Sequence, residues 1–408
     1  MSDVRLNEHQ LDAIEKMRTG CILVGEGGSG KSRTALAYYF MKVCGAKLTI
    51  NGIGDSKPMK NPRDLYIITT AKKRDDGDWL DELFPFTDPW FDQAKVTVDS
   101  WNNIKKYKDV YGAFFIFDEQ RLVGNGTWVK TFYNIARKNQ WVLLSGTPGD
   151  KWLDYIPVFV ANGFYRNKTE FNRMHCVYSP YITKYPKLEG YVNTKLLNQH
   201  KFDISIPLPV DRKTQPHNIG FTFSYDKELY KTVWKDRKDP YNDCPIEETG
   251  TLMYLLRKVV SQNEDRLRKV LEIIQNHQRV IVFYNYNYEL DDLRKLCREH
   301  EIAFGEWNGD VHSSIPDTER WAYLVQYIAG CEGWNCLTCN CMIFYSQTYS
   351  YKQLTQAKWR IDRLTTPFKD LWYYHLKSSA PIDLAIARSL AEKKEFNERK
   401  FLKGGGKV

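Results

Sequence analysis

The stretch Gly25-Glu26-Gly27-Gly28-Ser29-Gly30-Lys31-Ser32 decides the fold of this chain. It follows the short apolar run Cys21–Val24 and precedes residues 33–43, whose composition favours a helix. A GxxxxGKS sequence between a strand and a helix is the pattern of a phosphate-binding loop. Its glycines let backbone N–H groups turn toward a polyphosphate, and the helix N-terminus adds positive potential. The sequence therefore predicts a nucleoside triphosphate site.

Each residue of this loop has a predicted part in holding the nucleotide. Lys31 is expected to reach the β- and γ-phosphates, and Ser32 is expected to hold Mg²⁺. The alternative is a glycine-rich turn with a chance lysine, which the flanking strand and helix argue against. The remaining nucleotide-binding positions of the loop are Gly25, Gly27, Gly28, Ser29 and Gly30.

The composition is that of a soluble globular chain with room for two domains. Its 408 residues exceed one ordinary core, and 42% of them are hydrophobic. The net charge of +9, with 26 Tyr and 12 Trp available for stacking, favours a polyanionic partner. Apolar runs such as Ala113 to Phe117 are far too short to span a membrane. Met1–Arg5 lacks a signal-peptide pattern, so we expect a cytoplasmic protein with nine reduced cysteines.

Short apolar runs alternate with helical patterns along the chain. Such runs, bounded by polar loops, are typical of parallel strands covered by helices on both faces. Residues 207–212 are proline-rich and mark a boundary, and residues 45–63 are interpreted as a surface loop. We therefore predict an α/β fold with two doubly wound parallel-sheet domains, 1–212 with a helical extension and 213–403, followed by a disordered tail at 404–408.

The individual elements follow from the same patterns. The expected strands are Cys21–Val24, Leu65–Thr69, Lys95–Val98, Ala113–Phe117, Trp141–Ser145, Arg279–Tyr284, Tyr323–Ile328, Met342–Tyr345 and Leu371–Leu376. The expected helices of the second domain are Leu252–Asn276, Tyr288–Glu299, Leu354–Arg363 and Ile382–Phe396.

Two carboxylates end the hydrophobic strand that contains Phe114 to Phe117. In a phosphate-loop enzyme we expect this strand to lie beside the loop's own strand, so that Asp118 reaches the Mg²⁺ shell. Glu119 is then placed to polarise an attacking water. The alternative is an ordinary strand with acidic residues at its exit. Ser145 and Thr147, in the following Leu143–Pro148 segment, are expected to sense the γ-phosphate or to brace the two carboxylates.

The three motifs GEGGSGKS, IFDEQR and LLSGTP occur in the order found in superfamily-two helicases and translocases. Their spacing resembles that of the Swi/Snf-type DNA-dependent ATPases, and the resemblance extends from Leu6 to about Phe396. It implies two tandem RecA-like domains and an ATP-hydrolysing enzyme. Gln10 matches the family's adenine-reading glutamine. The chain lacks the large helical insertions of eukaryotic remodellers, so it resembles a minimal motor of phage or bacterial origin.

The resemblance also implies a set of nucleic-acid contacts. In the first domain two strips match segments that touch a nucleic-acid backbone, and in the second domain one residue follows the first expected strand. The residues concerned are Thr70, Ala71, Lys72, Ser100, Trp101 and Asn285.

The second domain is expected to supply arginines to the nucleotide. Residues 329–336 resemble the glycine-rich fifth motif, in which Gly333 is expected to contact nucleotide. Residues 356–363 resemble the sixth motif, in which Gln356 is expected to couple the domains. Arg360 and Arg363 lie three apart on an expected helix, so both are expected to project from one face. An arginine at the γ-phosphate contributes about 10³–10⁵ in rate; the alternative is a solvated basic helix face.

Several residues depart from the family's pattern. Arg121 stands where the DEAH-like box has a histidine, which puts the usual coupling of hydrolysis to the next motif in doubt. Asn7 stands where this type often has arginine, and Asp362 replaces a histidine of the sixth motif. Residues 345–350 replace a segment that contains Asp and Trp in the family.

Four cysteines lie close together in the second domain. Cys331, Cys336 and Cys339 have the spacing of a plant-type ferredoxin, and Cys341 follows them. Each falls where the fifth motif and its following strand require a small or apolar side chain, and free cysteine packs well as a small hydrophobe. We therefore predict core cysteines rather than an iron–sulfur or zinc site.

These features predict an ATP- and Mg²⁺-dependent DNA helicase or translocase that hydrolyses ATP in a cleft between its domains. It is expected to be a monomer that tracks duplex DNA without sequence preference, DNA being favoured over RNA as the partner. Replication or recombination proteins are further candidate partners. The alternative is a nucleotide-gated binding or annealing protein with weak motor activity. A phosphate-loop kinase or AAA-type ATPase does not account for residues 356–363.

Overall fold

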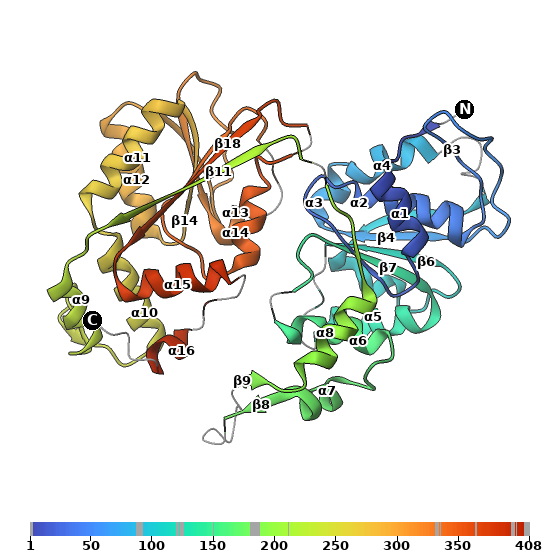
Figure 1. The fold of residues 1–408 in the computed structure, drawn as a ribbon, viewed down its shortest axis with the longest axis horizontal. Helices are drawn as coiled ribbons and strands as arrows, with labels where there is room; N and C mark the ends of the chain where they lie inside the picture. The colour runs from blue at the N-terminus through green and yellow to red at the C-terminus, as the bar shows by residue number, and fades with distance from the viewer. Residues whose placement is uncertain are drawn as a thin grey trace. The chain divides into compact units, whose positions relative to one another are not determined.

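The computed structural model describes residues 3–86, 93–119, 122, 126–149, 151–179, 188–210, 212–330, 334, 336–363, 365–392, 396 and 398–403. The chain divides into two compact units, Met1–Asp211 and Arg212–Val408. Each unit contains a six-stranded sheet in which all the strands are parallel (Figure 1). The predicted α/β fold with two parallel-sheet domains is confirmed. The predicted tail at 404–408 lies outside the described residues.

In the sheet of the first unit, one strand lies between the strand that precedes the phosphate loop and the strand that ends in Asp118. The order of this sheet is β10 (Ser205–Pro207), β2 (Ile22–Val24), β7 (Gln140–Ser145), β6 (Phe114–Asp118), β4 (Leu65–Thr69) and β5 (Val96–Ser100). The expectation that β6 lies beside β2 is therefore wrong. The run from Trp141 to Leu144 is buried throughout, as suits a strand that is paired on both edges.

The strands of this sheet send alternate side chains into two hydrophobic cores. On β6, Phe114 and Ile116 join one core, and Phe115 and Phe117 join the other. The first core is completed by helices α1 (Glu8–Lys16) and α2 (Lys31–Tyr38), which are drawn on one face of the sheet in Figure 1. On the opposite face lie α5 (Thr127–Lys138), α6 (Trp152–Ala161) and α8 (Thr194–Ile204).

Shorter elements complete the first unit. Residues 45–63 are more than a loop, because β3 (Thr49–Ile50) pairs with β1 (Asp3–Val4), and Lys47 forms a bridge with Lys57. The other elements are α3 (Ala71–Asp75), α4 (Asp78–Leu83), α7 (Lys168–His175), β8 (Cys176–Tyr178), β9 (Leu188–Tyr191), a π-helix at Tyr39–Val43, and 3₁₀-helices at Phe84–Phe86 and Trp101–Tyr107.

The sheet of the second unit contains two strands that the sequence patterns did not reveal. Its order is β11 (Gln215–Phe223), β18 (Asp370–Ser378), β17 (Cys341–Phe344), β14 (Arg279–Tyr284), β16 (Trp321–Gln326) and β15 (Ala303–Trp307). The unpredicted strands β11 and β15 form the two edges. Edge strands lack the continuous apolar run of a central strand, and the residues of β11 are alternately exposed and half-buried.

The helices of the second unit differ from the prediction at three places, one of which is α15 (Pro381–Ala391), which ends before the expected Phe396. The expected helix Leu252–Asn276 is two helices, α10 (Thr249–Ser261) and α11 (Glu264–His277). The break arises because the side chain of Asn263 accepts hydrogen bonds from the N–H groups of Asp265 and Arg266, which caps α11. The other elements are α9 (Lys227–Trp234), β12 (Lys238–Asp239), β13 (Cys244–Pro245), α12 (Asn287–Glu299), α13 (Tyr327–Gly330), α14 (Tyr351–Lys358) and α16 (Glu398–Lys403).

Helix α14 ends before the two predicted arginine fingers. The expectation that Arg360 and Arg363 share a helix face is wrong, because regular helix stops at Lys358. The chain then closes in tight turns, in which the Arg360 N–H donates to the Ala357 carbonyl oxygen and the Asp362 N–H donates to that of Lys358. Among the helices of the described residues, none is long and apolar enough to cross a membrane.

Candidate nucleotide site

The phosphate loop lies between β2 and α2, as its motif predicts. Gly28 and Gly30 have φ angles of 80° and 79°, in the left-handed region that favours glycine. Gly25 is required for space, because a Cβ there would lie 2.4 Å from the Ser29 hydroxyl and 3.1 Å from the Leu208 carbonyl oxygen. The glycines therefore allow a tight turn of the loop at the N-terminus of α2.

Lys31 is positioned within the loop itself. Its ammonium donates to the carbonyl oxygens of Gly25, at 2.6 Å, and Glu26, at 2.7 Å. Ser32 is the next residue of the helix and is half-buried. Because backbone carbonyls are exchangeable partners for an ammonium, this side chain is placed to contact a phosphate that enters the loop.

Gln10 lies against the phosphate loop. It is buried, and its amide nitrogen donates to the Gly30 carbonyl oxygen at 3.2 Å and to the Thr34 hydroxyl at 3.1 Å. Its amide oxygen accepts from the Asn7 N–H, which closes a capping box at the start of α1. The structure thus gives Gln10 a bracing contact with the loop, and adenine recognition stays a prediction.

Asp118 is the centre of a buried hydrogen-bond network. Its Oδ2 accepts from the Thr69 hydroxyl at 2.9 Å, from the Lys73 ammonium at 3.0 Å and from the Trp79 indole at 3.2 Å. Burial by itself raises the pKa of Asp118, but the charge of Lys73 outweighs it and holds that pKa below the ordinary value. Asp118 is therefore a stable carboxylate.

The neighbouring Glu119 has a strained backbone. Its φ angle is 55°, a conformation that is uncommon outside glycine and that clusters at functional sites. Its carboxylate lies 3.0 Å from the Lys73 ammonium, so one lysine bridges both acidic residues. Gln120 and Arg121, the rest of the acidic box, lie outside the described residues.

Ser145 connects the acidic strand with the phosphate loop. Strand β7 pairs with β2 through Val24 and Ser145, and the Gly25 N–H donates to the Ser145 carbonyl oxygen at 3.1 Å. The Ser145 hydroxyl accepts from the N–H of Thr147 at 3.2 Å. Ser145 therefore contacts the first glycine of the loop, and Thr147 contacts Ser145. The role of these two residues in coupling stays a prediction.

The first predicted nucleic-acid strip begins helix α3. The Thr70 hydroxyl accepts from the Lys73 N–H at 3.2 Å and so caps the helix, which starts at Ala71. Lys72 is exposed. The basic residues of α3 thus come shortly after the end of β4, where the Thr69 hydroxyl donates to Asp118.

The second predicted strip is buried. Ser100 and Trp101 each expose only 2% of their surface, so their side chains face the interior. The Trp101 indole N–H donates to the Asp118 carbonyl oxygen at 2.9 Å, and its ring stacks on Phe117 with a centroid distance of 5.4 Å. In this structure Trp101 supports the acidic strand rather than presenting its ring at the surface.

In the second unit, the predicted arginines extend beyond the end of α14. Arg360 donates through Nε to the Gln356 carbonyl oxygen at 3.1 Å and through Nη1 to that of Trp334 at 2.7 Å. Arg363 is half-buried. Gly333 lies outside the described residues, so the contact predicted for it has no description here.

Asn285 lies at the carboxyl edge of the second sheet. Its amide nitrogen donates to the Ser346 hydroxyl at 2.7 Å and to the Gln347 carbonyl oxygen at 3.2 Å. Its N–H donates to the carboxylate of Glu289, a residue fully buried at the start of α12. The divergent segment 345–350 is therefore attached to the predicted contact residue, and nucleic-acid binding by Asn285 stays a prediction.

The described cysteines of the second-unit cluster pack in the core, as predicted. Cys336, Cys339 and Cys341 belong to the hydrophobic core around β14 and β17, and the Cys339 thiol donates to the Arg279 carbonyl oxygen at 3.1 Å. Within the described part of the chain, which omits Cys331, no group of His, Cys, Asp or Glu side chains is arranged to hold a metal ion.

The residues at the phosphate loop fit the Mg²⁺ that accompanies a nucleoside triphosphate. Mg²⁺ prefers oxygen ligands and keeps several waters, so one carboxylate and one hydroxyl are sufficient protein ligands. The three donors to the Asp118 side chain all bind Oδ2, and no described residue donates to Oδ1. Asp118 and Ser32 would hold the ion, whose charge would neutralise the phosphates.

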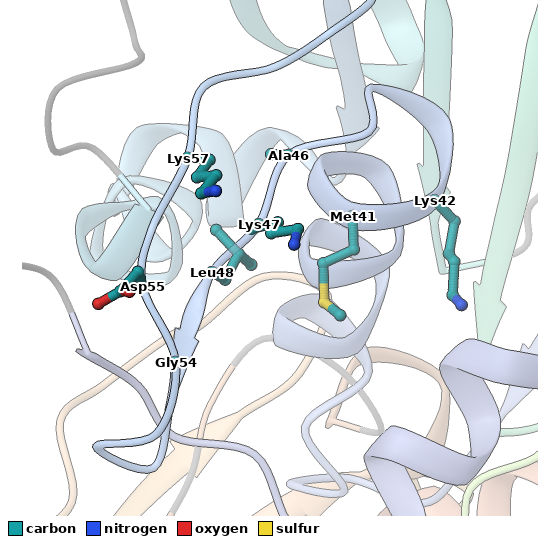
Figure 2. A pocket seen from close by; sticks show the side chains of 8 residues that line it. All are labelled: Met41, Lys42, Ala46, Lys47, Leu48, Gly54, Asp55 and Lys57. Atoms are coloured by element: carbon teal, nitrogen blue, oxygen red, sulfur yellow. The ribbon is translucent and has the colours of Figure 1, made fainter.

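A separate cavity of about 400 Å³ lies elsewhere in the first unit. Figure 2 shows it between the helical turn that carries Met41 and Lys42 and the turn that carries Gly54 and Asp55. None of the eight described residues that line it belongs to the predicted nucleotide site. Lys42 is also paired with Glu15 at 2.7 Å. This cavity therefore adds nothing to the nucleotide site.

The sequence interpretation missed three partners of Asp118, namely Thr69, Lys73 and Trp79. The available signal was their position, since all three come from the end of β4 and the two helices that follow it. Carboxyl ends of parallel strands meet at one edge of a sheet, and a lysine there is placed to pair with an acidic residue from another strand.

The fold and the phosphate loop agree with the resemblance found in the sequence. The chain has two parallel-sheet units, and the first carries a phosphate loop and a carboxylate pair at the same sheet edge, as the resemblance implies. The resemblance to superfamily-two helicases is supported by similarity to a relative that is described as an ATP-dependent helicase.

Comparisons with known proteins give the particular relatives. No family model matches the chain. Over 450 aligned residues it is 20% identical to an uncharacterized ATP-dependent helicase, YqhH, of Bacillus subtilis strain 168, and the match covers 96% of this chain and 78% of the relative. It is also similar to the solved SWI2/SNF2 ATPase core of Sulfolobus solfataricus in complex with dsDNA. That match has 14% identity and a TM-score of 0.40, and covers 98% of this chain and 93% of the other.

Proposed function

We propose that this protein is an ATP- and Mg²⁺-dependent DNA translocase that moves along duplex DNA without sequence preference. The observation that carries the proposal is the continuous set of contacts from the phosphate loop to the acidic pair. Gly25 is hydrogen-bonded to Ser145 on β7, and β7 pairs with β6, which ends at Asp118. A triphosphate on Lys31 and a Mg²⁺ on Asp118 would therefore share one sheet edge.

In the proposed reaction the first unit binds ATP and places the attacking water. Lys31 and the loop N–H groups would hold the phosphates, and Asp118 with Ser32 would hold Mg²⁺. Glu119 polarises the water. The second unit contributes Arg360 and Arg363 to the γ-phosphate, where their charge stabilises the transition state.

Duplex DNA is the proposed track because of charge and motif. The net charge is +9, and α3 carries Lys72, Lys73 and Arg74 in succession after the strip that resembles a nucleic-acid contact. Contacts of lysine and arginine with phosphates carry no sequence information and weaken with salt. We therefore propose sequence-independent, salt-sensitive binding by a monomer.

The decisive experiment compares Lys31→Ala with wild type in steady-state ATPase assays with and without duplex DNA. We expect the variant to lose turnover and to keep DNA binding, because Lys31 donates to the carbonyl oxygens of Gly25 and Glu26 in the phosphate loop. Lys42→Ala is the matched control, since Lys42 is an exposed lysine of the same unit paired with Glu15. Undiminished turnover in Lys31→Ala contradicts the proposal.

Two DNA assays separate translocation from strand separation. We expect ATP-dependent displacement of a triplex-forming strand from blunt duplex DNA and little displacement of a strand from a tailed duplex. Turnover that does not respond to DNA, together with no displacement in either assay, favours the second candidate, a nucleotide-gated binding or annealing protein. The residues 345–350, which depart from the family's motor signature, motivate that candidate.

A further inference from the structure

We propose that Lys73 is a positioning residue that restrains Asp118 and Glu119 until a nucleic-acid phosphate reaches helix α3 and draws its ammonium away. This inference rests on the proposed function and adds to it a means by which DNA controls hydrolysis. Lys73 would be the link between the track and the nucleotide site.

The first observation is the bridge itself. The Lys73 ammonium lies 3.0 Å from Oδ2 of Asp118 and 3.0 Å from Oε1 of Glu119. These are the carboxylates proposed to hold Mg²⁺ and to polarise the attacking water. An ammonium at this position opposes the arrival of a second cation at Asp118, and it engages the Glu119 oxygen that a water would need.

The second observation is that the side chain of Lys73 is partly exposed, while that of Asp118 is buried and held by other residues. The Lys73 side chain is 32% exposed, whereas that of Asp118 is 3% exposed and is also held by Thr69 and Trp79. The Lys73 side chain is thus the member of this pair that an anion from solvent can reach.

The third observation is the orientation of helix α3. Lys72, Lys73 and Arg74 are consecutive, yet their side chains have three different environments. Lys72 is exposed, Lys73 reaches the acidic pair, and Arg74 donates to the Asp99 carboxylate at 3.2 Å and to the Ser100 hydroxyl at 3.3 Å. The helix thus joins both predicted nucleic-acid strips to the catalytic carboxylates.

A phosphate at this helix supplies the competing anion. A DNA phosphate that binds the exposed end of α3 lies within reach of a flexible four-carbon side chain, and Lys73 can exchange Glu119 for it. This exchange removes the Lys73 ammonium from the Glu119 carboxylate and removes its positive charge from Asp118. Binding of DNA would raise turnover by this exchange, without movement of the backbone of β6.

The test measures steady-state ATPase with and without duplex DNA for wild type, Lys73→Gln, Lys73→Arg and Lys138→Gln. We expect Lys73→Gln to raise turnover without DNA several-fold and to reduce the stimulation by DNA to near none. Lys73→Arg keeps the charge and should retain the low basal rate. Lys138→Gln is the matched control, because Lys138, the last residue of α5, forms an ion pair of 3.7 Å with the exposed Asp109.

A second measurement follows Mg²⁺ rather than turnover. With a fluorescent ATP analogue, the Mg²⁺ concentration for half-maximal binding should fall several-fold in Lys73→Gln, because a competing cation is removed from Asp118. Thermal unfolding with and without the analogue shows that the variant is folded and binds nucleotide. A structural role alone would lower stability without shifting this Mg²⁺ dependence.

The outcomes are distinguishable. A Lys73→Gln enzyme whose basal turnover is unchanged or lower, with intact DNA stimulation, overturns the inference, as does loss of analogue binding in that variant. These results leave the proposed function standing if wild type is stimulated by DNA and Lys31→Ala is inactive. Absence of DNA stimulation in wild type overturns the proposed function, and the inference falls with it.

Discussion

The indole N–H of Trp101 donates to the backbone carbonyl oxygen of Asp118 across 2.9 Å. Trp101 directly follows β5 and Asp118 ends β6, two strands that β4 separates in the sheet. The indole ring also stacks on Phe117, the residue before Asp118. A side chain that sequence resemblance assigns to nucleic acid therefore packs against β6, the strand that ends in Asp118. Its loss should affect hydrolysis before it affects DNA affinity.

Replacement of Trp101 by Phe should separate these two roles. Phe keeps most of the apolar volume but removes the donor to Asp118, which leaves a buried carbonyl oxygen without this bond. We expect stability to fall by about 1–3 kcal/mol, typical of an unsatisfied buried group. ATP turnover should fall several-fold, while the DNA dissociation constant measured by fluorescence anisotropy should stay near that of wild type. A large loss of DNA affinity with normal turnover would show that the ring binds DNA directly.

Gly25→Ala should abolish nucleotide binding. The added Cβ would lie 2.4 Å from the Ser29 hydroxyl and 3.1 Å from the Leu208 backbone oxygen, so the loop must shift. Titration of a fluorescent ATP analogue measures the effect. Gly250→Ala is the control, because nothing lies within 4 Å of a Cβ at that helical position. Wild-type affinity in Gly25→Ala would mean that the loop has another conformation when nucleotide is bound.

Arg360→Ala should reduce the catalytic rate far more than it reduces ATP-analogue affinity. We expect a loss of about 10³-fold or more in kcat, the scale of an arginine that acts on the γ-phosphate. Arg360→Lys should not restore the rate, because the planar guanidinium also donates to the carbonyl oxygens of Gln356 and Trp334. The control is Arg268→Ala, an exposed arginine of the same unit that pairs with Asp265. Equal turnover in the two alanine variants would remove Arg360 from the catalytic set.

Lys358 should make the stability of the second unit depend on alkaline pH. Burial lowers the pKa of Lys358 to about 8, although the charge of Asp362 acts in the opposite direction. The ordinary pKa is about 10.4, so between these values the unfolded chain binds the proton more strongly than the folded one. The free energy of unfolding therefore rises with pH between about 8 and about 10.4, and Lys358 contributes up to about 3 kcal/mol to this rise.

Lys358→Met isolates this effect, because the variant has no group to titrate there. The difference in unfolding temperature between wild type and variant should change in favour of wild type as pH rises from 8 to 10. Lys358 also donates to Asn218 at 2.6 Å, so the variant loses one hydrogen bond at every pH, and only the slope is diagnostic. Parallel curves would show that Lys358 has an ordinary pKa.

Fold prediction succeeded where a strand is buried on both faces. The interior strands β4 and β14 have the expected bounds, because continuous apolar runs such as Leu65–Thr69 leave little choice of structure. It failed where local signals are weak or compete. The edge strands β11 and β15 carry half-exposed residues, and the cap at Asn263 divides a periodic apolar pattern that otherwise reads as one helix.

The candidate site was predicted in its local parts and missed in its long-range ones. The acidic pair could be found because Asp118 and Glu119 directly follow an apolar strand. Lys73 could not, because its partner is 45 residues away and the pairing depends on which strand lies beside which. The arginines were predicted from a motif, and their role stays a prediction. The helix expected to carry both was predicted to end at Arg363, whereas α14 ends at Lys358, since the tight turns that follow leave little sequence signature.

The sequence by itself determined the phosphate loop. Every group needed to hold a polyphosphate lies within residues 25–32, and glycine conformations with a helix N-terminus are sufficient to form the cradle. Only the tertiary structure decided that β7 separates this loop from the acidic strand, that Trp101 supports Asp118 and that Lys73 bridges both carboxylates. Those relationships depend on strand order and packing, which bring together residues whose separation in the chain carries no local signal.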